Sequence, residues 1–225
     1  MKTHIKRSAI SVILVILAAM LLCSCSNDVT PIPENTSSDT ENTDPPQMLI
    51  FADFKAYLDF EGSVSLSDED FAAFISDNSY DMNGVQSKDD VKRYCETIDK
   101  LPVPEDPGLT LRDIVFYPER EECSVTFTGA GDAVYSLDYY TGSDKKKGIQ
   151  DIADKKLTGF SAVSADVDSV YDVTDADDDF YAYYAIIDGY RVLYRAYDTD
   201  ESNAIGLLEN SKFAALSAFS AKTQE

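Results

Sequence analysis

Apolar residues in the first part of the chain recur at spacings of three and four, which is typical of amphipathic helices. One face of a first predicted helix carries Ile50, Phe51, Phe54, Tyr57 and Leu58. Ser67 and Ser87 each precede acidic and then apolar residues. Serine caps helix N-termini and acidic side chains interact favourably with the helix dipole there, so two further helices are predicted. Pro102 and Pro104 end the last of them, because proline cannot continue a helix.

From Leu109 onward the apolar spacing changes to two, the period of strands with one buried face. Strands are predicted over residues 112–117, 123–128, 133–141, 167–174, 180–187 and 190–197. The first three form an antiparallel meander, and the last two flank Asp188-Gly189, a dipeptide that favours a two-residue hairpin turn. A short helix near 201–210 and an apolar tail over 213–219 follow. The sequence therefore predicts an α+β fold, with N-terminal helices packed on a curved antiparallel β-sheet made of the meander and the C-terminal hairpin.

The two-residue turn also predicts which side chains share a face of the hairpin, because it places Ile187 opposite Tyr190. The face with Ile187 is the natural core face. The other face mixes aromatic residues with two arginines and includes Tyr184, Arg191, Arg195 and Tyr197. This mixture suits a platform for a sugar or a peptide. Ordinary packing, including packing against the N-terminal helices, is the alternative.

The N-terminal sequence predicts that the protein is exported from the cytoplasm. A basic start is followed by an apolar run of about 14 residues, shorter than the roughly 20 that span a bilayer and typical of a secretion signal. The run ends in Leu22-Cys23-Ser24-Cys25, which resembles a bacterial lipobox. That resemblance implies a lipoprotein signal peptide over 1–24 and lipidation of Cys25; an ordinary cleaved signal peptide is the alternative. Cys25 and the polar, acidic residues after it predict a lipidated, disordered linker over 25–46, which leaves one extracytoplasmic domain over 47–221.

Charge and histidine content exclude several function classes. The chain has 19 Lys+Arg against 41 Asp+Glu and a formal net charge of −22. Nucleic acid is therefore a poor partner, and adsorption to anionic lipid is disfavoured. The sole histidine is His4, inside the predicted signal peptide. The processed chain therefore has no Ser-His-Asp or Cys-His catalysis and no histidine-ligated zinc or copper.

Calcium is the one cofactor that the residue pattern suggests. Asp198, Asp200, Ser202 and Glu209 match positions one, three, five and twelve of an EF-hand loop. However, the preceding segment is a predicted strand, where an EF-hand needs a helix, so Asp198 or Asp200 acting as a helix cap is the alternative. A second acidic group, at a predicted turn, consists of Asp172, Asp175, Asp177, Asp178 and Asp179. It is either another calcium candidate or a solvated turn.

Cys95 and Cys123 are the cysteines of the predicted domain. They are free to form a disulfide in an oxidising compartment or to remain as buried thiols.

The order of lipobox, acidic linker, helices, meander and tyrosine-rich hairpin resembles uncharacterised secreted lipoprotein domains that are common in Firmicutes. The likeness runs from about residue 101 to 219 and includes the turn at Tyr117–Glu119 and the return strand Asp188–Tyr194. It implies a binding or sensing module that faces the cell envelope, and it carries no catalytic residues. We therefore expect a non-enzymatic module on the outer face of the cell membrane. Its partners would be the bilayer, through the lipid, and a cell-envelope polymer or protein.

Two other functions stay open. One is a carboxylate-dependent hydrolase of cell-wall or glycan polymers, and the other is a calcium-dependent adhesion or structural module. A cleft with two close carboxylates, one of them with a raised pKa, would favour the hydrolase. A shallow surface lined by tyrosine and arginine would favour binding.

Overall fold

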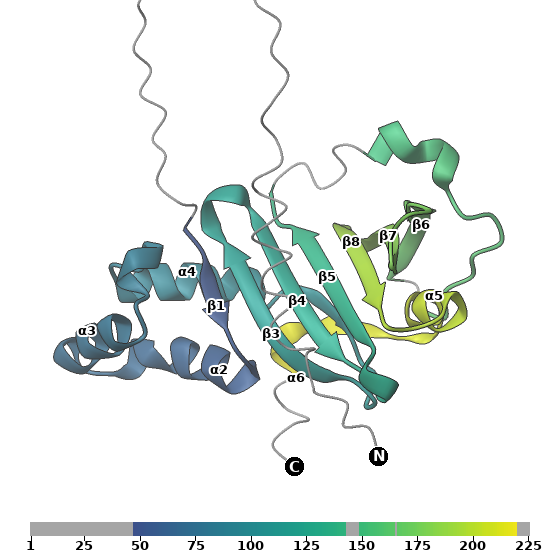
Figure 1. Ribbon diagram of the computed structural model, residues 1–225. Helices are drawn as coiled ribbons and strands as arrows, with labels where there is room; N and C mark the ends of the chain where they lie inside the picture. Colours follow the sequence, from purple (N-terminus) through teal and green to yellow (C-terminus); the bar gives the residue numbers. More distant parts are fainter. Residues whose placement is uncertain (1–46, 143–148, 165, 220–225) are drawn as a thin grey trace, which may run out of the picture. The chain divides into compact units, whose positions relative to one another are not determined.

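The computed structural model describes residues 47–142, 149–164 and 166–219. Its largest element is an antiparallel sheet of seven strands (Figure 1). In spatial order its strands are β1 (Leu49–Phe51), β3 (Thr110–Tyr117), β4 (Glu122–Thr128), β5 (Val134–Tyr140), β8 (Tyr190–Tyr197), β7 (Phe180–Ile187) and β6 (Val167–Asp172). A smaller sheet pairs β2 (Pro102–Pro104) with β9 (Phe213–Ala215). The α+β class with an antiparallel sheet is confirmed. The predicted signal peptide, Cys25 and the linker to residue 46 lie outside the described residues.

Most of the helices precede the main strands, as predicted. The described helices are α2 (Phe54–Gly62), α3 (Asp68–Asp77), α4 (Lys88–Ile98), α5 (Glu201–Asn210) and α6 (Leu216–Phe219). Short 3-10 helices are η1 (Ser63–Ser65), η2 (Asp81–Asn83), η3 (Pro118–Arg120), η4 (Ala130–Asp132) and η5 (Ile149–Lys155). Among the described helices, none is both long enough and apolar enough to cross a membrane.

Both predicted serine caps are confirmed. Ser67 Oγ accepts a hydrogen bond from the backbone N–H of Asp70, and Ser87 Oγ accepts one from that of Asp90, each at 3.2 Å. These bonds satisfy backbone donors that the first turn of a helix leaves without a partner. The first turns of α3 and α4 are acidic, as the helix dipole favours.

The position predicted for the start of the first helix is wrong. Ile50 and Phe51 lie in strand β1, where Phe51 is buried and Ile50 is 50% exposed. The helix begins only after Asp53, whose Oδ1 accepts a hydrogen bond from the backbone N–H of Ala56 at 2.7 Å. Three residues are too few to separate a period of two from a period of 3.6, so the pattern alone could not distinguish them. The pairing of Phe51 with Ile114 of β3 decides the outcome.

The meander and the hairpin agree with the predicted pattern. In the hairpin Ile187 pairs with Tyr190, Tyr183 with Tyr194 and Phe180 with Tyr197, in the predicted register. The turn residues Asp188 and Gly189 have φ values of +47° and +73°. A two-residue turn with both central residues in the left-handed region matches the twist of the strands.

One face of the sheet forms the core, and the helices pack against it. In Figure 1, α6 lies behind β3 and β4, and α5 lies to the right, beside β8. Tyr94 of α4 packs edge-on against Phe116 of β3, with ring centres 5.4 Å apart. Tyr194 of β8 donates its hydroxyl hydrogen to the carbonyl of Ala204 in α5 at 2.9 Å. The buried side of the sheet is therefore the one that carries Ile187, as predicted.

Candidate functional site

The opposite face of the sheet carries the predicted ligand surface. We call it the open face, and over β5, β8 and β7 it consists of Ser136, Asp138, Tyr140, Arg191, Leu193, Arg195, Tyr197, Phe180, Ala182, Tyr184 and Ile186. Ala182 and Ile186 are buried, and the other members are half-buried. The structure brings the four predicted residues together on this face. Tyr184 lies opposite Leu193, the residue between Arg191 and Arg195 on the same side of β8, and Tyr197 follows Arg195. All four side chains are half-buried.

A chain of polar contacts crosses the middle of the open face. The guanidinium of Arg195 forms an ion pair with Asp138 of β5, and the two side chains are 32% and 30% exposed. Ser136 Oγ donates to the other oxygen of Asp138 at 3.0 Å, and the hydroxyl of Ser124 on β4 lies 3.2 Å from that of Ser136. A carboxylate and a guanidinium held in this way present hydrogen-bonding groups in a fixed orientation.

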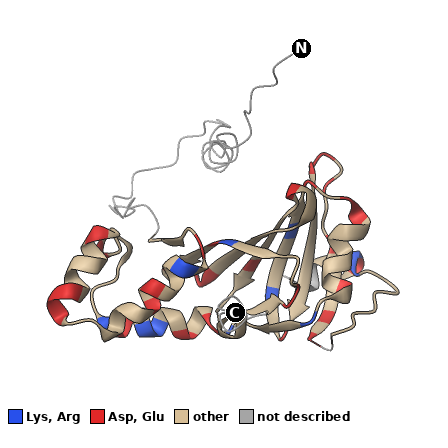
Figure 2. Ribbon diagram, turned by 90° about the horizontal axis from the view of Figure 1, so that it is seen from below, with Lys and Arg blue, Asp and Glu red and all other residues tan. Residues whose placement is uncertain are grey.

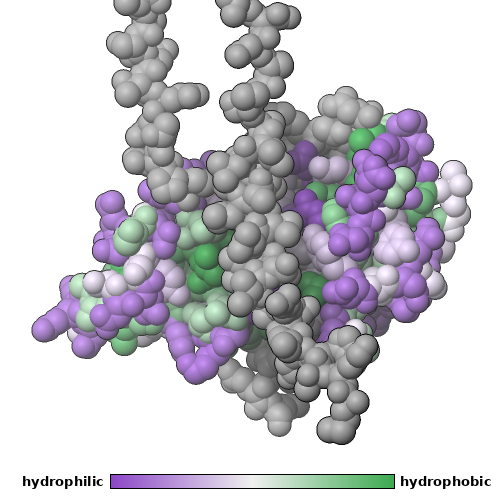
Figure 3. All heavy atoms as spheres, viewed as in Figure 1, coloured by the Kyte–Doolittle hydropathy of each residue, from purple (hydrophilic) through white to green (hydrophobic). Residues whose placement is uncertain are grey.

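Aromatic rings flank this polar chain. The guanidinium carbon of Arg191 lies 4.7 Å from the centre of the Tyr140 ring, and the rings of Phe180 and Tyr197 are 5.0 Å apart. Burial raises the pKa of the Tyr197 phenol, although Arg195 acts in the opposite direction, so the phenol keeps its proton at neutral pH. Figure 3, viewed as in Figure 1, shows hydrophobic residues interspersed with hydrophilic ones over the helices at the left and over the right-hand part of the molecule. Tyrosine and arginine are enriched where proteins bind partners.

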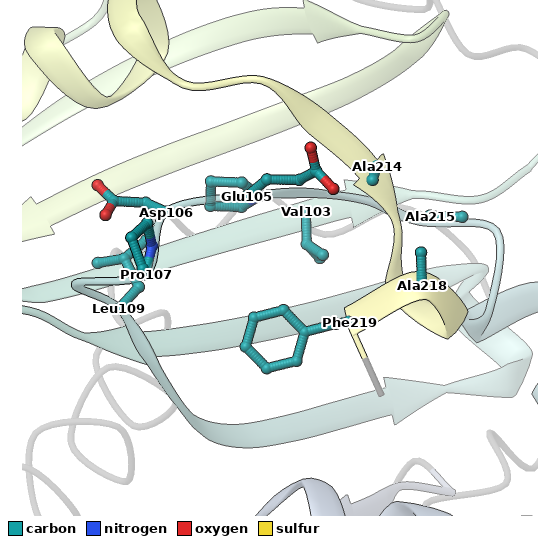
Figure 4. A pocket seen from close by; sticks show the side chains of 10 residues that line it. Val103, Glu105, Asp106, Pro107, Leu109, Ala214, Ala215, Ala218 and Phe219 are labelled. Atoms are coloured by element: carbon teal, nitrogen blue, oxygen red, sulfur yellow. The ribbon is translucent and has the colours of Figure 1, made fainter. Parts of the chain in front are cut away.

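A separate hollow lies beside the small sheet, and sequence reasoning missed it. It measures about 420 Å³, within the range of ligand pockets. In Figure 4 the side chain of Val103 and the ring of Phe219 face the same space, and Glu105 and Asp106 lie along the edge away from Phe219. Two segments about 110 residues apart in sequence build it: β2 with the loop after it, and the β9–α6 segment. No local pattern in either segment signals such a hollow.

Glu105 and Asp106 line this hollow, but the carboxyl group with a raised pKa lies elsewhere. That group is Glu61 on α2, where partial burial and the nearby Asp99 raise the pKa. Asp99 accepts the hydroxyl hydrogen of Tyr57 at 2.6 Å, and this cluster lies between α2 and α4. Glu61 lines neither the hollow beside β2 nor a shallower one of about 320 Å³ between α2 and α3. The arrangement named above as favouring a hydrolase is therefore not assembled at either of these two hollows.

The four EF-hand candidates are not brought together. Asp200 caps α5, with Oδ1 accepting the backbone N–H of Asn203 at 2.8 Å, and Asp198 lies just before it in the loop after β8. Ser202 and Glu209 are both inside α5. At about 1.5 Å per residue, roughly 13 Å of helix separates Asp200 from Glu209. The helix-cap alternative therefore describes Asp200.

Two of the five carboxylates at the acidic turn accept hydrogen bonds from its own backbone. Asp172 Oδ1 accepts the backbone N–H of Thr174 at 3.0 Å, and Asp175 Oδ1 lies 3.4 Å from that of Asp177. Over the part of the chain that the structure describes, no three Asp, Glu, His or Cys residues are grouped so as to hold a metal ion.

Cys95 and Cys123 are free thiols, and both are buried. Burial raises the pKa of Cys95 to about 12 and that of Cys123 still further above the usual value. Because the thiolate is the reactive form, these cysteines act as core residues.

Charge elsewhere on the described surface is mainly negative. Figure 2 shows acidic residues in red along the helices and at the turns, with fewer basic residues between them. The two arginines of the open face therefore lie on a protein whose sequence is strongly acidic.

Comparison with known proteins found no relative. No protein family, no curated protein and no solved structure matches the chain.

Proposed function

We propose that this protein is a lipid-anchored extracytoplasmic binding module whose open face receives a polymer or protein of the cell envelope. The observation that carries this proposal is the row Ser124, Ser136, Asp138 and Arg195, which holds polar groups in place between half-buried tyrosines. Fixed donors and acceptors reduce the entropy lost on binding, and the rings beside them supply apolar contact area.

The lipid anchor in this proposal rests on the sequence around Leu22–Cys25. The acidic composition supports the same arrangement, since a domain of this charge is repelled by an anionic lipid surface while its lipid keeps it nearby. The open face then remains available to molecules of the envelope.

Binding is tested by co-sedimentation of the processed chain, made soluble by Cys25→Ser, with purified Gram-positive cell-wall sacculi and separately with envelope proteins bound to beads. The double variant Arg191→Gln/Arg195→Gln should lose at least tenfold in retention, because arginine side chains often dominate binding energy. The control Lys92→Gln/Arg93→Gln removes the same two charges from the exposed side of α4. It should bind like the parent chain.

Equal losses in both double variants would show that net charge, and not the open face, governs retention. Failure of the parent chain to bind either fraction would contradict the binding proposal.

Lipidation has its own test in bacterial cells fed with labelled palmitate. Cys25→Ser should abolish incorporation of label, whereas Cys23→Ser should retain it, because only Cys25 has a small residue directly before it. Label that survives Cys25→Ser would refute the anchor.

A further inference from the structure

We infer that the ligand of the open face is an uncharged glycan strand, and not an anionic polymer or a protein of the same envelope. This inference rests on the binding function proposed above and names the class of ligand that the same surface takes. Three features of the face support it: its polar and apolar rows, the pairing of its charges, and the position of its strands inside the sheet.

Cross-strand pairing arranges the side chains of the open face in rows that run across the strands. In one row Thr126 of β4 lies between Asp113 of β3 and Ser136 of β5. Ser136 in turn lies opposite Arg195 of β8. Neighbouring strands are about 4.8 Å apart, so this polar row is about 14 Å long. Sugar hydroxyls both donate and accept hydrogen bonds, and the row offers hydroxyl, carboxylate and guanidinium groups along its length.

The next row adds apolar and aromatic contact area. It lies two residues further along the strands, about 7 Å away. There Asp138 of β5 lies opposite Leu193 of β8, and Leu193 lies opposite Tyr184 of β7. Tyr171 of β6 extends the row beyond Tyr184. A pyranose ring has apolar C–H faces as well as hydroxyl edges, so a polar row beside an aromatic one fits both parts of a sugar.

The charges beside the polar row are paired with one another. Arg195 forms its ion pair with Asp138, and Arg112 Nε lies 3.4 Å from a carboxylate oxygen of Asp113. A phosphate polymer would compete with Asp138 for the guanidinium, on a chain with a net charge of −22. An uncharged ligand requires no such exchange, because a guanidinium with five N–H donors can hold a carboxylate and a sugar hydroxyl together.

The polar row lies on strands that are mostly inside the sheet. β4 lies between β3 and β5, and β8 lies between β5 and β7. A peptide that extends a sheet adds to an unpaired strand edge, and a helical peptide needs a groove. Neither of the two hollows described above is lined by a residue of the open face. The surface therefore suits a ligand that lies across the strands and is recognised by its hydroxyl groups and ring faces.

The probes are three uncharged hexasaccharides, namely chitohexaose, cellohexaose and maltohexaose, and a glycerol phosphate hexamer, which carries a charge on every unit. Each is titrated into the full processed chain carrying Cys25→Ser, and binding is followed by NMR of the backbone amides. We expect at least one hexasaccharide to shift the amides of β4, β5 and β8, with an affinity that added salt leaves unchanged. The phosphate oligomer should bind about tenfold more weakly or not at all.

Substitution of Asp138 tests the pairing of charges. Asp138→Asn keeps an oxygen for the Ser136 hydroxyl but leaves Arg195 without its counter-charge. The affinity for the hexasaccharide should fall about fivefold, because a carboxylate is the stronger acceptor, while the affinity for the phosphate oligomer should rise. The matched control Asp89→Asn removes the acid paired with Lys92 on the exposed side of α4. It should change neither affinity.

Substitution of Tyr184 separates the aromatic ring from its hydroxyl. Tyr184→Phe keeps the ring and should bind the hexasaccharide within about twofold of the parent chain, whereas Tyr184→Val removes the ring and should lose about fivefold. Phenylalanine and valine both favour strands, and the amide spectra of the free variants check that the sheet is intact.

The outcomes separate this inference from the function on which it rests. Retention on sacculi or envelope proteins without binding of any hexasaccharide would overturn the glycan assignment alone. Tighter binding of the phosphate oligomer than of the sugars would do the same, as would equal responses of Asp138→Asn and Asp89→Asn. A parent chain that neither is retained on either fraction nor binds any hexasaccharide would overturn both proposals.

Discussion

Replacing Tyr139 with phenylalanine tests how the main sheet is joined to the small one. Tyr139 lies on the core face of β5 and is 1% exposed. Its hydroxyl donates a hydrogen bond to the carbonyl of Pro102 in β2 at 2.5 Å. Burial raises the pKa of this phenol well above its usual value, so it stays a hydrogen-bond donor throughout the neutral range.

The size of the effect follows from what the substitution removes. The ring remains, so almost no cavity forms, but the carbonyl of Pro102 loses a donor at a position where both residues are buried. Leaving a buried acceptor without its partner costs about 1 to 3 kcal/mol. For a domain of this size each kcal/mol lowers the melting temperature by about 2 to 4 °C, so a fall of roughly 2 to 12 °C is expected.

Urea unfolding followed by circular dichroism measures the decrease in the free energy of unfolding. If the slope of that free energy against urea concentration is unchanged, the substitution has not altered the surface exposed on unfolding. Tyr184→Phe is the matched control, because this tyrosine is half-buried on the open face. It should change stability by less than about 0.5 kcal/mol. If the two variants differed by less than that amount, the Tyr139–Pro102 bond would not hold the two sheets together.

Two further substitutions have signs that follow from the structure. The pKa of Glu61 is raised by burial and by Asp99, so the folded state favours its protonated form, and that contribution is lost as pH rises through the folded-state pKa. Glu61→Gln should therefore stabilise the protein at pH 7 by a few tenths of a kcal/mol, since the site is largely exposed, and the gain should vanish near pH 4 in unfolding experiments. A gain that persisted at low pH would contradict this origin. Gly189→Ala should cost about 1 to 2 kcal/mol, because Gly189 has a φ of +73°. Its control Gly62→Ala, with a φ of −63° and open space around the added carbon, should be neutral or slightly stabilising in thermal melts; equal costs would refute the argument from backbone strain.

Sequence reasoning succeeded where a local rule fixes the geometry. The Asp188-Gly189 turn sets the register of the hairpin, and the register places Tyr184, Arg191 and Arg195 on one face. It failed for β1, where three residues fit two periods equally well. Sequence reasoning also failed for β2, because Pro102–Pro104 signals the end of a helix more strongly than a strand. Strand β9 was missed with it, since β9 pairs with β2.

The hollow beside β2 could not be predicted for a different reason. Its lining joins residues near 105 to residues near 216, and only the folding of the chain brings them together. The ion pair between Asp138 and Arg195 is similar, since it depends on β5 lying next to β8. Neighbouring strands in a sheet can be inferred from a turn, but not when about 50 residues connect them.

The strand order has a consequence for how the protein is made. A chain emerges from the ribosome N-terminus first, so β3, β4 and β5 are complete while the far side of β5 still lacks its neighbour. That neighbour is β8, which ends at Tyr197 near the close of the described chain. Until β8 arrives, the backbone groups of Val134–Tyr140 form a bare strand edge on which other chains can add. The growing chain therefore leaves this edge without its partner strand from the synthesis of its fifth strand until that of its eighth.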